Sequence, residues 1–403
     1  MNYTKIKTVF VLFFLISCNS LDEAQVWQKG NLHTHSLWSD GDDFPEMIIQ
    51  WYKDNDYQFL ALSDHNTISK DKNRWYKIGE REINNKTLEK YKDRFGDWVE
   101  EKTDDEGTYV RLKPYEEYKN KLEEEGFIII RSEEVTSGFE DTFRRNKPVH
   151  INVTNIQEKI EPFKGESVLD VMQQTLDAVY EQRKRTNQPM FAHINHPNFG
   201  YGISTDDLKK LNGERFFEVY NGHPAVNNEG NEYHLDTESM WDLINIHYYN
   251  NDKPLMFGIA TDDSHNYHQQ STSLSNTGRG WVMVNTKSLE TNNIITQMEA
   301  GNFYSSSGIY LKSLASDNKG ISIEIDPEPN IEYGIHFIGY KKGDDNTKNF
   351  KSIEGKKAKY IFEKDDVFVR VKIVSTALMP NPYTDGETKK AWTQPLIVNQ
   401  LFD

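Results

Sequence analysis

The sequence predicts an α/β fold followed by a smaller antiparallel β unit. Between residues 30 and 302, short apolar runs alternate with segments of helical period, which predicts a parallel sheet or a βα barrel. After Phe303 the period changes to two, as in the run from Val367 to Val371, and turn-forming residues separate such runs. The 403 residues suffice for one large domain, assigned to residues 30–302, and a small β-rich one, assigned to residues 303–403.

Eight apolar runs of the large domain are predicted as strands. They cover residues 31–35, 58–63, 127–132, 149–153, 189–194, 216–221, 255–260 and 281–284. Helices are predicted between them. One covers residues 44–54, where Pro45 suits the first helical turn; a second carries Val168, Met172, Leu176 and Val179 on one face; a third carries Ile294, Ile295 and Met298.

Residues 70–125 depart from this alternation. The segment is rich in Lys, Glu, Asp and Tyr and has few apolar residues, so it is interpreted as a mostly helical insertion that covers one face of the large domain. We call it the charged insertion. A solvated charged surface is the default meaning of such a composition, and a role in substrate binding is the alternative.

The net charge of the chain is -16. Such a charge repels polyanions at long range, so a long nucleic acid is not an expected partner, whereas a small substrate or a short single strand stays possible. A metal site could reverse the sign of the field locally. The sequence makes no prediction of the oligomeric state.

The N-terminus is predicted to direct the chain out of the cytoplasm. Lys5 and Lys7 precede an apolar run over residues 9–16, which is too short to span a bilayer and is typical of a signal peptide, assigned to residues 1–17. Cys18 follows directly. Because it is the single cysteine of the sequence, an intramolecular disulfide and a multi-cysteine zinc site are excluded. The alternative is an ordinary signal peptide with an incidental cysteine.

The position of Cys18 resembles the lipobox of bacterial lipoproteins. This resemblance implies that Cys18 becomes the lipid-modified first residue of the mature chain, followed by a tether over residues 18–29. The protein would then be a membrane-anchored lipoprotein of the periplasm or the cell surface.

Side chains able to bind metal follow or end seven of the predicted strands. They are His33, His35, Asp64, His65, Glu134, His150, His193, His196, Glu218, Asp263 and His265. The carboxyl ends of the strands meet at one mouth in a βα barrel, so scattered positions can form one site. The pair His33 and His35 lies on one face of an extended segment. Imidazoles with a carboxylate suit Zn, Mn or Fe, and a bridging carboxylate suits a site with more than one ion.

The order of these motifs resembles the PHP (polymerase and histidinol phosphatase) family. The matching motifs are His33-Thr-His35-Ser-Leu-Trp-Ser-Asp40-Gly, Ser63-Asp64-His65-Asn66, Glu134-Val-Thr, Val-His150-Ile, Asn-His196-Pro-Asn and Asp263-Ser-His265. The resemblance covers roughly residues 30–308, with the charged insertion poorly covered.

The resemblance implies a distorted (βα)7 TIM-like barrel over residues 30–302 that holds two to three divalent metal ions and hydrolyses phosphoesters. One ion would be held by His33, His35, Glu134 and Asp263. A second would share Glu134 and use His150 and His196, and a third would use Asp40, His65 and His265. A hydroxide held by the ions, available near neutral pH because metal binding lowers the pKa of water to about 7, would attack a small phosphorylated substrate. Asp64, His65 and Glu134 are the predicted catalytic residues; Asp64 would orient a neighbouring group or shuttle a proton, and a structural cap at the end of the strand is an equal alternative.

Two further residues are predicted to contact the substrate. Arg279 could pair with a phosphate, and Asn221 lies at the predicted mouth together with Glu218, where a packed, hydrogen-bonded role is an equal alternative. His196 is preferred to His193 as a ligand because its context matches the family motif. The competing functions are a hydrolase acting on a non-phosphate bond with the same metals, and a non-catalytic binding lipoprotein that retains the fold.

Overall fold

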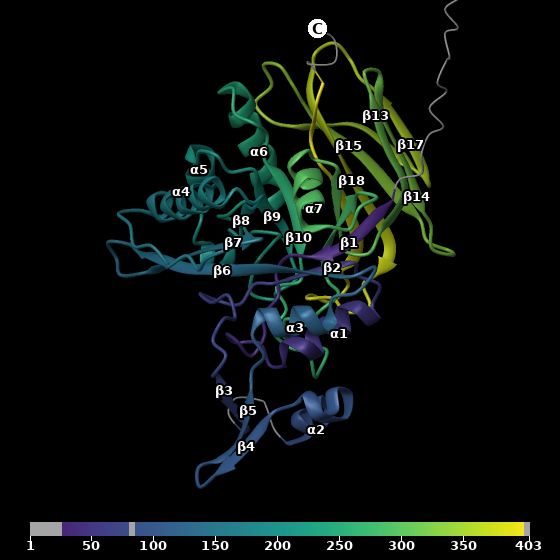
Figure 1. The fold of residues 1–403 in the computed structure, drawn as a ribbon. Helices are drawn as coiled ribbons and strands as arrows, with labels where there is room; N and C mark the ends of the chain where they lie inside the picture. Colours follow the sequence, from purple (N-terminus) through teal and green to yellow (C-terminus); the bar gives the residue numbers. More distant parts are fainter. Residues whose placement is uncertain (1–25, 80–84, 399–403) are drawn as a thin grey trace, which may run out of the picture.

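The computed structural model describes residues 26–79 and 85–398 (Figure 1). The large domain contains strands β1 (Trp27–Asn31), β2 (Phe59–Leu62), β6 (Ile128–Glu140), β7 (Asn146–Thr154), β8 (Phe191–Ile194), β9 (Phe216–Asn221), β10 (Phe257–Thr261) and β11 (Trp281–Asn285). Its helices outside the charged insertion are α1 (Pro45–Asp54), α4 (Val168–Thr186), α5 (Thr205–Lys210), α6 (Thr237–Asn250) and α7 (Thr291–Glu299), with the short 3-10 helix η2 (Phe199–Tyr201). The mixed α/β class predicted from the sequence is confirmed.

Capping residues explain where the longer helices begin. Pro45 occupies the first turn of α1, where a missing N–H costs nothing. The side chain of Ser167 accepts a hydrogen bond from the N–H of Asp170 at the start of α4, and Asp236 caps α6 in the same way. Helix α4 packs on β6, β7 and β8, α6 packs on β9, and α7 packs on β11.

One large mixed sheet runs through the molecule in the order β10-β9-β8-β7-β6-β2-β1-β11-β12-β19-β18-β15-β16. Strands β1, β2 and β6 are parallel, as are β8, β9 and β10, but β7 is antiparallel to both of its neighbours. This differs from the predicted parallel arrangement because a tight turn, rather than a crossover helix, joins β6 to β7.

The sheet curls so that the segments that follow β1 and β10 meet, although these two strands do not pair with each other. The N–H of Asp263 donates to the carbonyl of His33 at 3.0 Å, and Thr34 forms an isolated bridge with Ser264. Within the described ranges no closed barrel is found, so the predicted (βα)7 barrel is not confirmed. The curling still brings the segments that follow β1 and β10 together, and these segments carry several predicted ligands.

The sequence suggested that the charged insertion is mostly helical, but the structure shows both strands and helices there. It contains β3 (Trp75–Lys77), α2 (Asn85–Phe95), the 3-10 helix η1 (Gly96–Trp98), β4 (Glu101–Asp104), β5 (Gly107–Arg111) and α3 (Tyr115–Leu122). The three strands form an antiparallel sheet in the order β3-β5-β4 that extends away from the body (Figure 1). A two-residue turn between β4 and β5 allows this hairpin, and the high density of charged residues hid its alternation.

A small core attaches the charged insertion to the loop after β1. Phe44 stacks on Tyr91 with ring centroids 4.1 Å apart, and Leu88 and Val110 join the same buried cluster as Trp38. The insertion is therefore packed against the segment that leads from β1 into α1, close to several predicted ligands.

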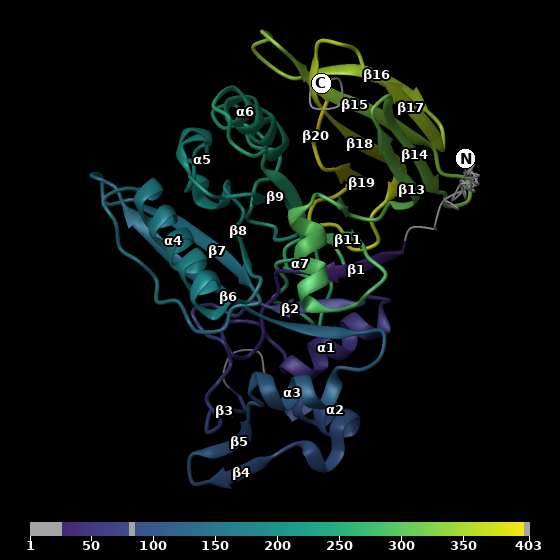
Figure 2. The same ribbon diagram turned by 45° about the horizontal axis from the view of Figure 1, so that its top comes forward.

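The C-terminal strands continue the large sheet. They are β12 (Phe303–Ser306), β13 (Tyr310–Asp317), β14 (Gly320–Asp326), β15 (Tyr333–Lys341), β16 (Lys348–Glu354), β17 (Lys357–Ile361), β18 (Asp366–Leu378), β19 (Thr388–Thr393) and β20 (Leu396–Ile397). Strand β12 pairs with both β11 and β19, while β13, β14 and β17 form a second sheet that shares a buried core with β15 and β18. Figure 2 shows these strands on one side of the molecule and α4, α5 and α6 on the other.

The N-terminal predictions fall largely outside the described residues. The predicted signal peptide and Cys18 are not described, and β1 begins at Trp27, so the last three residues of the predicted tether form part of a strand. Across residues 26–79 and 85–398, no helix combines the length and the apolar character needed to cross a membrane.

Candidate metal centre

The predicted ligands lie on the strands and on the segments that follow them. His33 and His35 follow β1, which ends at Asn31 rather than continuing through the pair as predicted. His65 follows β2, His196 follows β8, and Asp263 and His265 follow β10, whereas Glu134 and His150 lie within β6 and β7. Because β6 and β7 form a long hairpin, their middle residues come level with the ends of the shorter strands.

His33 and His35 point their Nε2 atoms at each other. These two nitrogen atoms are 3.1 Å apart, and Asp263 Oδ1 lies 3.1 Å from the first and 3.2 Å from the second. All three side chains are nearly or fully buried. Two imidazole lone pairs and a carboxylate oxygen that converge in a buried space match the donors of a divalent metal ion.

Glu134 lies at the centre of the cluster. Its Oε1 lies within 3.6 Å of nitrogen atoms of His33, His150 and His196. Its Oε2 lies 3.3 Å from His35 Nε2 and 2.6 Å from His65 Nδ1. Burial alone would raise the pKa of Glu134, but the surrounding histidines, His65 first, hold it well below its usual range. One carboxylate therefore faces five histidines and can bridge ions.

Asp40, His65 and His265 form the outer part of the cluster. Asp40 lies 3.4 Å from the Nε2 atoms of both histidines and 3.6 Å from His35 Nδ1. Burial would lower the pKa of His65, but Glu134 and Asp40 raise it to about 11. The side chain of Asp40 is 47% exposed and that of His65 is 24% exposed, whereas His33 and Glu134 are inaccessible. The site opens to solvent on this side.

Glu218 and Asn195 support the cluster from behind. Glu218 Oε1 accepts a hydrogen bond from His33 Nδ1 at 2.7 Å, which leaves His33 Nε2 available as a ligand atom. Asn195 Nδ2 donates to Glu134 Oε1 at 2.7 Å. The sequence placed Glu218 at the predicted mouth, with a packed, hydrogen-bonded role and substrate contact as equal alternatives, and it did not single out Asn195. The adjacent His196 was the only local signal for Asn195.

The hydrogen bonds of Asp64 fit the structural alternative that the sequence left open beside its predicted catalytic role. Its Oδ1 accepts hydrogen bonds from the N–H of Ser36 and the hydroxyl of Ser39, both at 2.7 Å, and its Oδ2 accepts one from the hydroxyl of Ser36. The carboxylate is buried and is directed into the loop that leads to Asp40. It therefore fixes the position of an outer ligand.

The two predicted substrate contacts also have structural roles. Asn221 is buried and donates from Nδ2 to Glu218 Oε2 at 2.8 Å and to Asp263 Oδ2 at 3.1 Å, so it orients carboxylates. Arg279 is fully buried. Its side chain donates to backbone carbonyls of Gly222, Ser271, Leu274, Asn381 and Pro382. Its donors join loops that are distant in sequence, which no local pattern reveals.

The donor set fits divalent metal ions. Four groups, each with ligand atoms within 4.8 Å of one another, include all nine predicted ligands: His35-Asp40-His65-His265, His33-His35-Asp263, His33-Glu134-His196 and His65-Glu134-His150. The groups differ from the predicted sets because His35 also reaches the outer group. Two buried atoms of the cluster, Glu134 Oε2 and His150 Nδ1, lie 2.6 Å from His65 Nδ1 and 3.0 Å from Glu134 Oε1, respectively, but without the geometry of a hydrogen bond. Unpaired buried polar atoms are costly, and a cation would satisfy them.

Comparison with known proteins gives distant structural likenesses. No family model matches the chain, and no curated protein matches it. One similar structure is a two-domain protein from Bacteroides vulgatus ATCC 8482 that contains a predicted PHP-like metal-dependent phosphoesterase. It is 13% identical to this chain, with a TM-score of 0.42, and the match covers 92% of this chain and 96% of that one. A protein from Bifidobacterium adolescentis ATCC 15703, provisionally assigned as a metal-dependent phosphoesterase, is 13% identical with a TM-score of 0.29, covering 59% of this chain and 88% of that one.

Proposed function

We propose that this protein is a metal-dependent hydrolase of the PHP type that cleaves a small phosphate monoester or a short phosphodiester. The observation that carries the proposal is the position of Glu134, whose two oxygen atoms lie within 3.6 Å of nitrogen atoms of five histidines. Neutral imidazoles offer nitrogen lone pairs, and several divalent ions would use these nitrogen atoms together with the carboxylate oxygens as ligands.

Buried and exposed residues of the site would have different roles. His33, His35, Glu134 and Asp263 are inaccessible or nearly so and would hold ions rigidly. When bound, two or three Zn, Mn or Fe ions would supply Lewis acidity that activates water and neutralises charge on a phosphoryl group. Asp40, His65 and His265 lie on the open side, where the substrate would enter.

His65 is the best-placed residue for proton transfer. It is part exposed, and Glu134 and Asp40 on either side raise its pKa. With ions bound only at the inner groups, His65 would hold a proton near the leaving oxygen while Glu134 keeps the ring in position; with a third ion at Asp40, His65 and His265, it would be a ligand instead. Asp64, which the sequence suggested for this task, is committed to Ser36 and Ser39.

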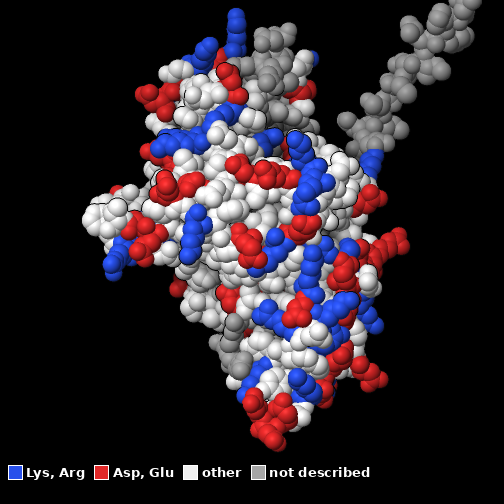
Figure 3. Space-filling view, turned by 60° about the vertical axis from the view of Figure 1, so that its left-hand side comes forward, with Lys and Arg blue, Asp and Glu red and all other residues white. Residues whose placement is uncertain are grey.

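The surface does not favour a long nucleic acid as the substrate. Figure 3 shows basic and acidic side chains interspersed over the face in view, without a broad positive area. With a net charge of -16, long-range attraction of a polyanion is not expected, and a small substrate could still be attracted by the ions at the mouth.

Metal analysis and a substrate panel test the proposal. Purified protein is expected to bind at least two equivalents of divalent metal and to hydrolyse members of a phosphoester panel, with activity lost on chelation and restored by metal. His33→Ala should remove both properties, while His336→Ala, on β15 in the C-terminal sheet, should retain them. One equivalent of metal or less, with hydrolysis equal to that of His33→Ala, would contradict the proposal.

The same panel separates the competing chemistries. Carboxylic esters and amides are included beside phosphoesters, because the same ions can polarise a carbonyl group. Hydrolysis confined to those compounds would assign the protein to the non-phosphate hydrolases. Metal binding without any hydrolysis would favour the binding lipoprotein.

We also propose that Cys18 anchors the protein to a membrane outside the cytoplasm. The support is the sequence order of two lysines, an apolar run over residues 9–16 and Cys18. Globomycin-sensitive processing and labelling with a radioactive fatty acid are expected for the native chain and absent from Cys18→Ser. Labelling that survives in this variant would overturn the assignment.

A further inference from the structure

Six aromatic side chains form a closed circuit at the candidate metal centre. Ring centroids of neighbours in the circuit lie 5.1 to 6.3 Å apart. In order of contact, the members are His65, His150, His196, Phe199, His223 and His265, which returns to His65. Four of them are predicted metal ligands, whereas Phe199 and His223 have no assigned role. All except His196 are part exposed, so the circuit borders the open side of the site.

The loop after β9 holds His223 in a fixed position. The N–H of His223 donates to Asn221 Oδ1 at 2.8 Å. Asn221 is also the residue whose side-chain amide orients two carboxylates of the centre. The carbonyl of Gly222 accepts a hydrogen bond from Arg279 Nη1 at 2.8 Å. The fully buried Arg279 therefore fixes the backbone next to His223.

The hydrogen bonds of the ring nitrogens separate His223 from the ligands. Nδ1 of His33 lies 2.7 Å from a carboxylate oxygen, and Nδ1 of His265 lies 2.9 Å from a backbone carbonyl. These Nδ1 atoms carry the proton, which leaves the lone pair of Nε2 for a metal ion. His223 Nδ1 instead accepts a hydrogen bond from the N–H of Ala225 at 3.1 Å. The proton of its ring is therefore on Nε2, which makes this atom a donor and not a ligand.

The Nε2–H of His223 is not used by the chain. In residues 26–79 and 85–398, no hydrogen-bond partner of this atom is found. Burial lowers the pKa of His223 to about 4, so the ring is neutral near pH 7 and keeps this tautomer. A fixed neutral donor beside a metal centre is suited to an oxygen atom of an anion that the ions hold.

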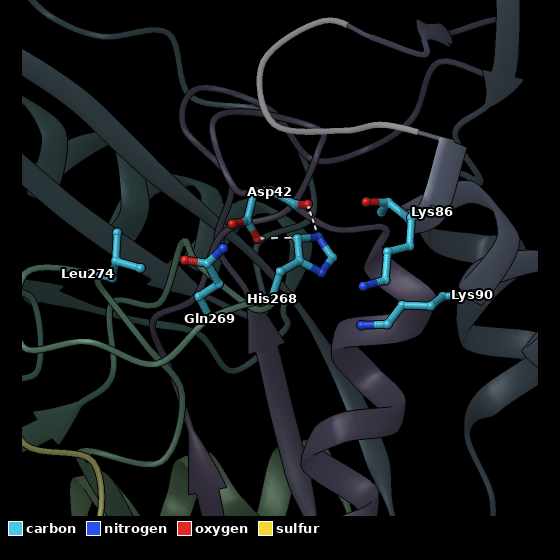
Figure 4. A pocket seen from close by; sticks show the side chains of 7 residues that line it. Asp42, Lys86, Lys90, His268, Gln269 and Leu274 are labelled. Atoms are coloured by element: carbon cyan, nitrogen blue, oxygen red, sulfur yellow. Dashed lines mark hydrogen bonds and ion pairs between the residues drawn. The ribbon is translucent and has the colours of Figure 1, made fainter.

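The ligand His265 does not need His223 to hold it in place. The N–H of Asp42 donates to the carbonyl of His265 at 2.8 Å, and His268 Nε2 lies 2.7 Å from the Asp42 carbonyl. Figure 4 shows His268 against Asp42 on the wall of a neighbouring pocket. His265 is thus fixed from the side of the loop after β1, so support of this ligand does not explain His223.

We propose that His223 binds the substrate by donating its Nε2–H to an oxygen atom of the phosphoryl group at the metal centre. This inference rests on the proposed phosphoesterase function and adds a substrate contact that is not a metal ligand. Arg279 and Asn221, the contacts predicted from the sequence, instead support the loop that carries His223. Charge on the phosphoryl oxygens must be neutralised during transfer, so a donor fixed there assists both binding and hydrolysis.

Phosphonate binding tests the inference without hydrolysis. Phenylphosphonate is titrated calorimetrically into the zinc-loaded full-length protein and into two variants. His223→Phe keeps a ring but has no donor, so Kd should rise about tenfold. His223→Gln keeps an N–H donor at the end of the side chain, so Kd should stay within about threefold of the native value. Both variants should bind as much zinc as the native protein, because His223 is not a ligand.

His234→Phe is the matched control. His234 belongs to the same loop, stacks on Tyr201 with ring centroids 3.8 Å apart and lies 3.0 Å from Asn231 Oδ1. The same substitution there should leave Kd unchanged. The inference would be overturned by a Kd of His223→Phe within about twofold of the native value, by zinc lost from that variant, or by a native protein that does not bind phenylphosphonate.

The tautomer of His223 can be measured directly in the native protein. Long-range ¹H–¹⁵N spectra of zinc-loaded protein labelled with ¹⁵N-histidine should show its proton on Nε2, with the signals identified by their loss in His223→Gln. Phenylphosphonate should shift the Nε2 signal of His223 and leave that of His234 in place. A proton on Nδ1, or no shift at saturating phenylphosphonate, would contradict the inference even where His223→Phe does not fold.

Hydrolysis distinguishes this inference from the function on which it rests. With a phosphoester that the native protein cleaves, His223→Phe should lower kcat/KM roughly tenfold or more, and His223→Gln should recover most of the loss. Equal kcat/KM in the native protein and His223→Phe contradicts the donor role alone. Absence of hydrolysis in the native protein contradicts the proposed function, while the phosphonate titration still decides whether His223 binds an anion.

Discussion

Two regions of the molecule bury charged side chains and differ in how the charge is compensated. At the C-terminal sheet, Arg370 of β18 is 1% exposed and donates to both oxygens of Asp242 of α6, at 2.8 and 3.0 Å. Its guanidinium also lies 4.8 Å from the ring of Trp241. At the metal centre, by contrast, Glu134 faces five histidines and no lysine or arginine is among its partners at ion-pair distance in the described residues.

The difference separates a structural ion pair from a ligand site. Arg370 makes two well-placed hydrogen bonds to Asp242, and its Nη1 lies 3.6 Å from Glu238 Oε2, so its charge is compensated within the chain and it joins α6 to the C-terminal sheet. The cluster around Glu134 has more imidazole nitrogen atoms than acceptors, and its open side at Asp40 leads to solvent. Four substitutions can break or sharpen this comparison.

Glu134→Gln should have the largest effect. The substitution keeps the volume of the side chain but removes the charge that five histidines face, so metal content should fall and kcat/KM should drop by at least roughly a thousandfold. Metal analysis and steady-state kinetics measure this. Glu133→Gln is the matched control, because Glu133 is also buried on β6 but accepts a hydrogen bond from the N–H of Ile160 instead. Equal losses in both variants would show that burial, not ligation, matters.

Arg370→Met should cost stability and leave chemistry intact. Removing one partner of a buried pair leaves the Asp242 carboxylate uncompensated, so the free energy of unfolding should fall by roughly 3–5 kcal/mol, measured by denaturant titration. Activity per folded molecule should not change. In the double variant Arg370→Met/Asp242→Leu much of the loss should be recovered. A double variant as unstable as the single one would contradict the ion-pair explanation.

Glu46 shows a third way to bury a carboxyl group, which is to protonate it. Burial raises its pKa from 4.5 to about 8 at the start of α1. The folded state holds the proton more tightly than the unfolded state, so protonation of Glu46 raises the free energy of unfolding. This stabilisation is complete below pH 4.5 and is lost as the pH rises to 8. Glu46→Gln should reduce the decline in unfolding free energy over this window by roughly 4 kcal/mol.

Denaturant titrations across this pH range measure the effect of Glu46→Gln. The exposed Glu89 of α2 provides the control, since Glu89→Gln should leave the slope of stability against pH unchanged. A native slope that Glu46→Gln does not alter would show that Glu46 is ionised in the folded protein.

Glu218→Gln should have the smallest effect of the four. Glu218 orients His33 and does not need to touch an ion, so metal affinity should fall roughly tenfold, measured by competition with a chelator. Glu214→Gln is the control, because Glu214 is buried at the other end of the same segment and accepts hydrogen bonds from Arg215 and Phe216. A loss as large as that of Glu134→Gln would place Glu218 among the direct ligands.

Residue type and local spacing were sufficient to predict most strands and to place side chains able to bind metal at strand ends, while the assignment of nine of them as ligands came from the resemblance to the PHP family. His33 and His35 are marked by their alternate spacing, and every predicted ligand falls in one of the converging groups of donors. The strand predicted at residues 216–221 matches β9, because a run of buried apolar residues is a local property. The mixed α/β class follows from the same local periodicity.

Only the tertiary structure decided how these parts are connected. Strand β7 runs antiparallel to its neighbours because of the hairpin with β6, and its apolar pattern is the same in either direction. Arg279 was predicted to contact the substrate, but its buried side chain donates to Asn381, 102 residues away, and so joins two loops. The charged insertion is held beside the loop after β1 because Tyr91 of α2 packs on Phe44, which is far from it in the sequence. A local pattern specifies which residues lie on one face, whereas the partners of that face come from distant segments and are fixed only by packing.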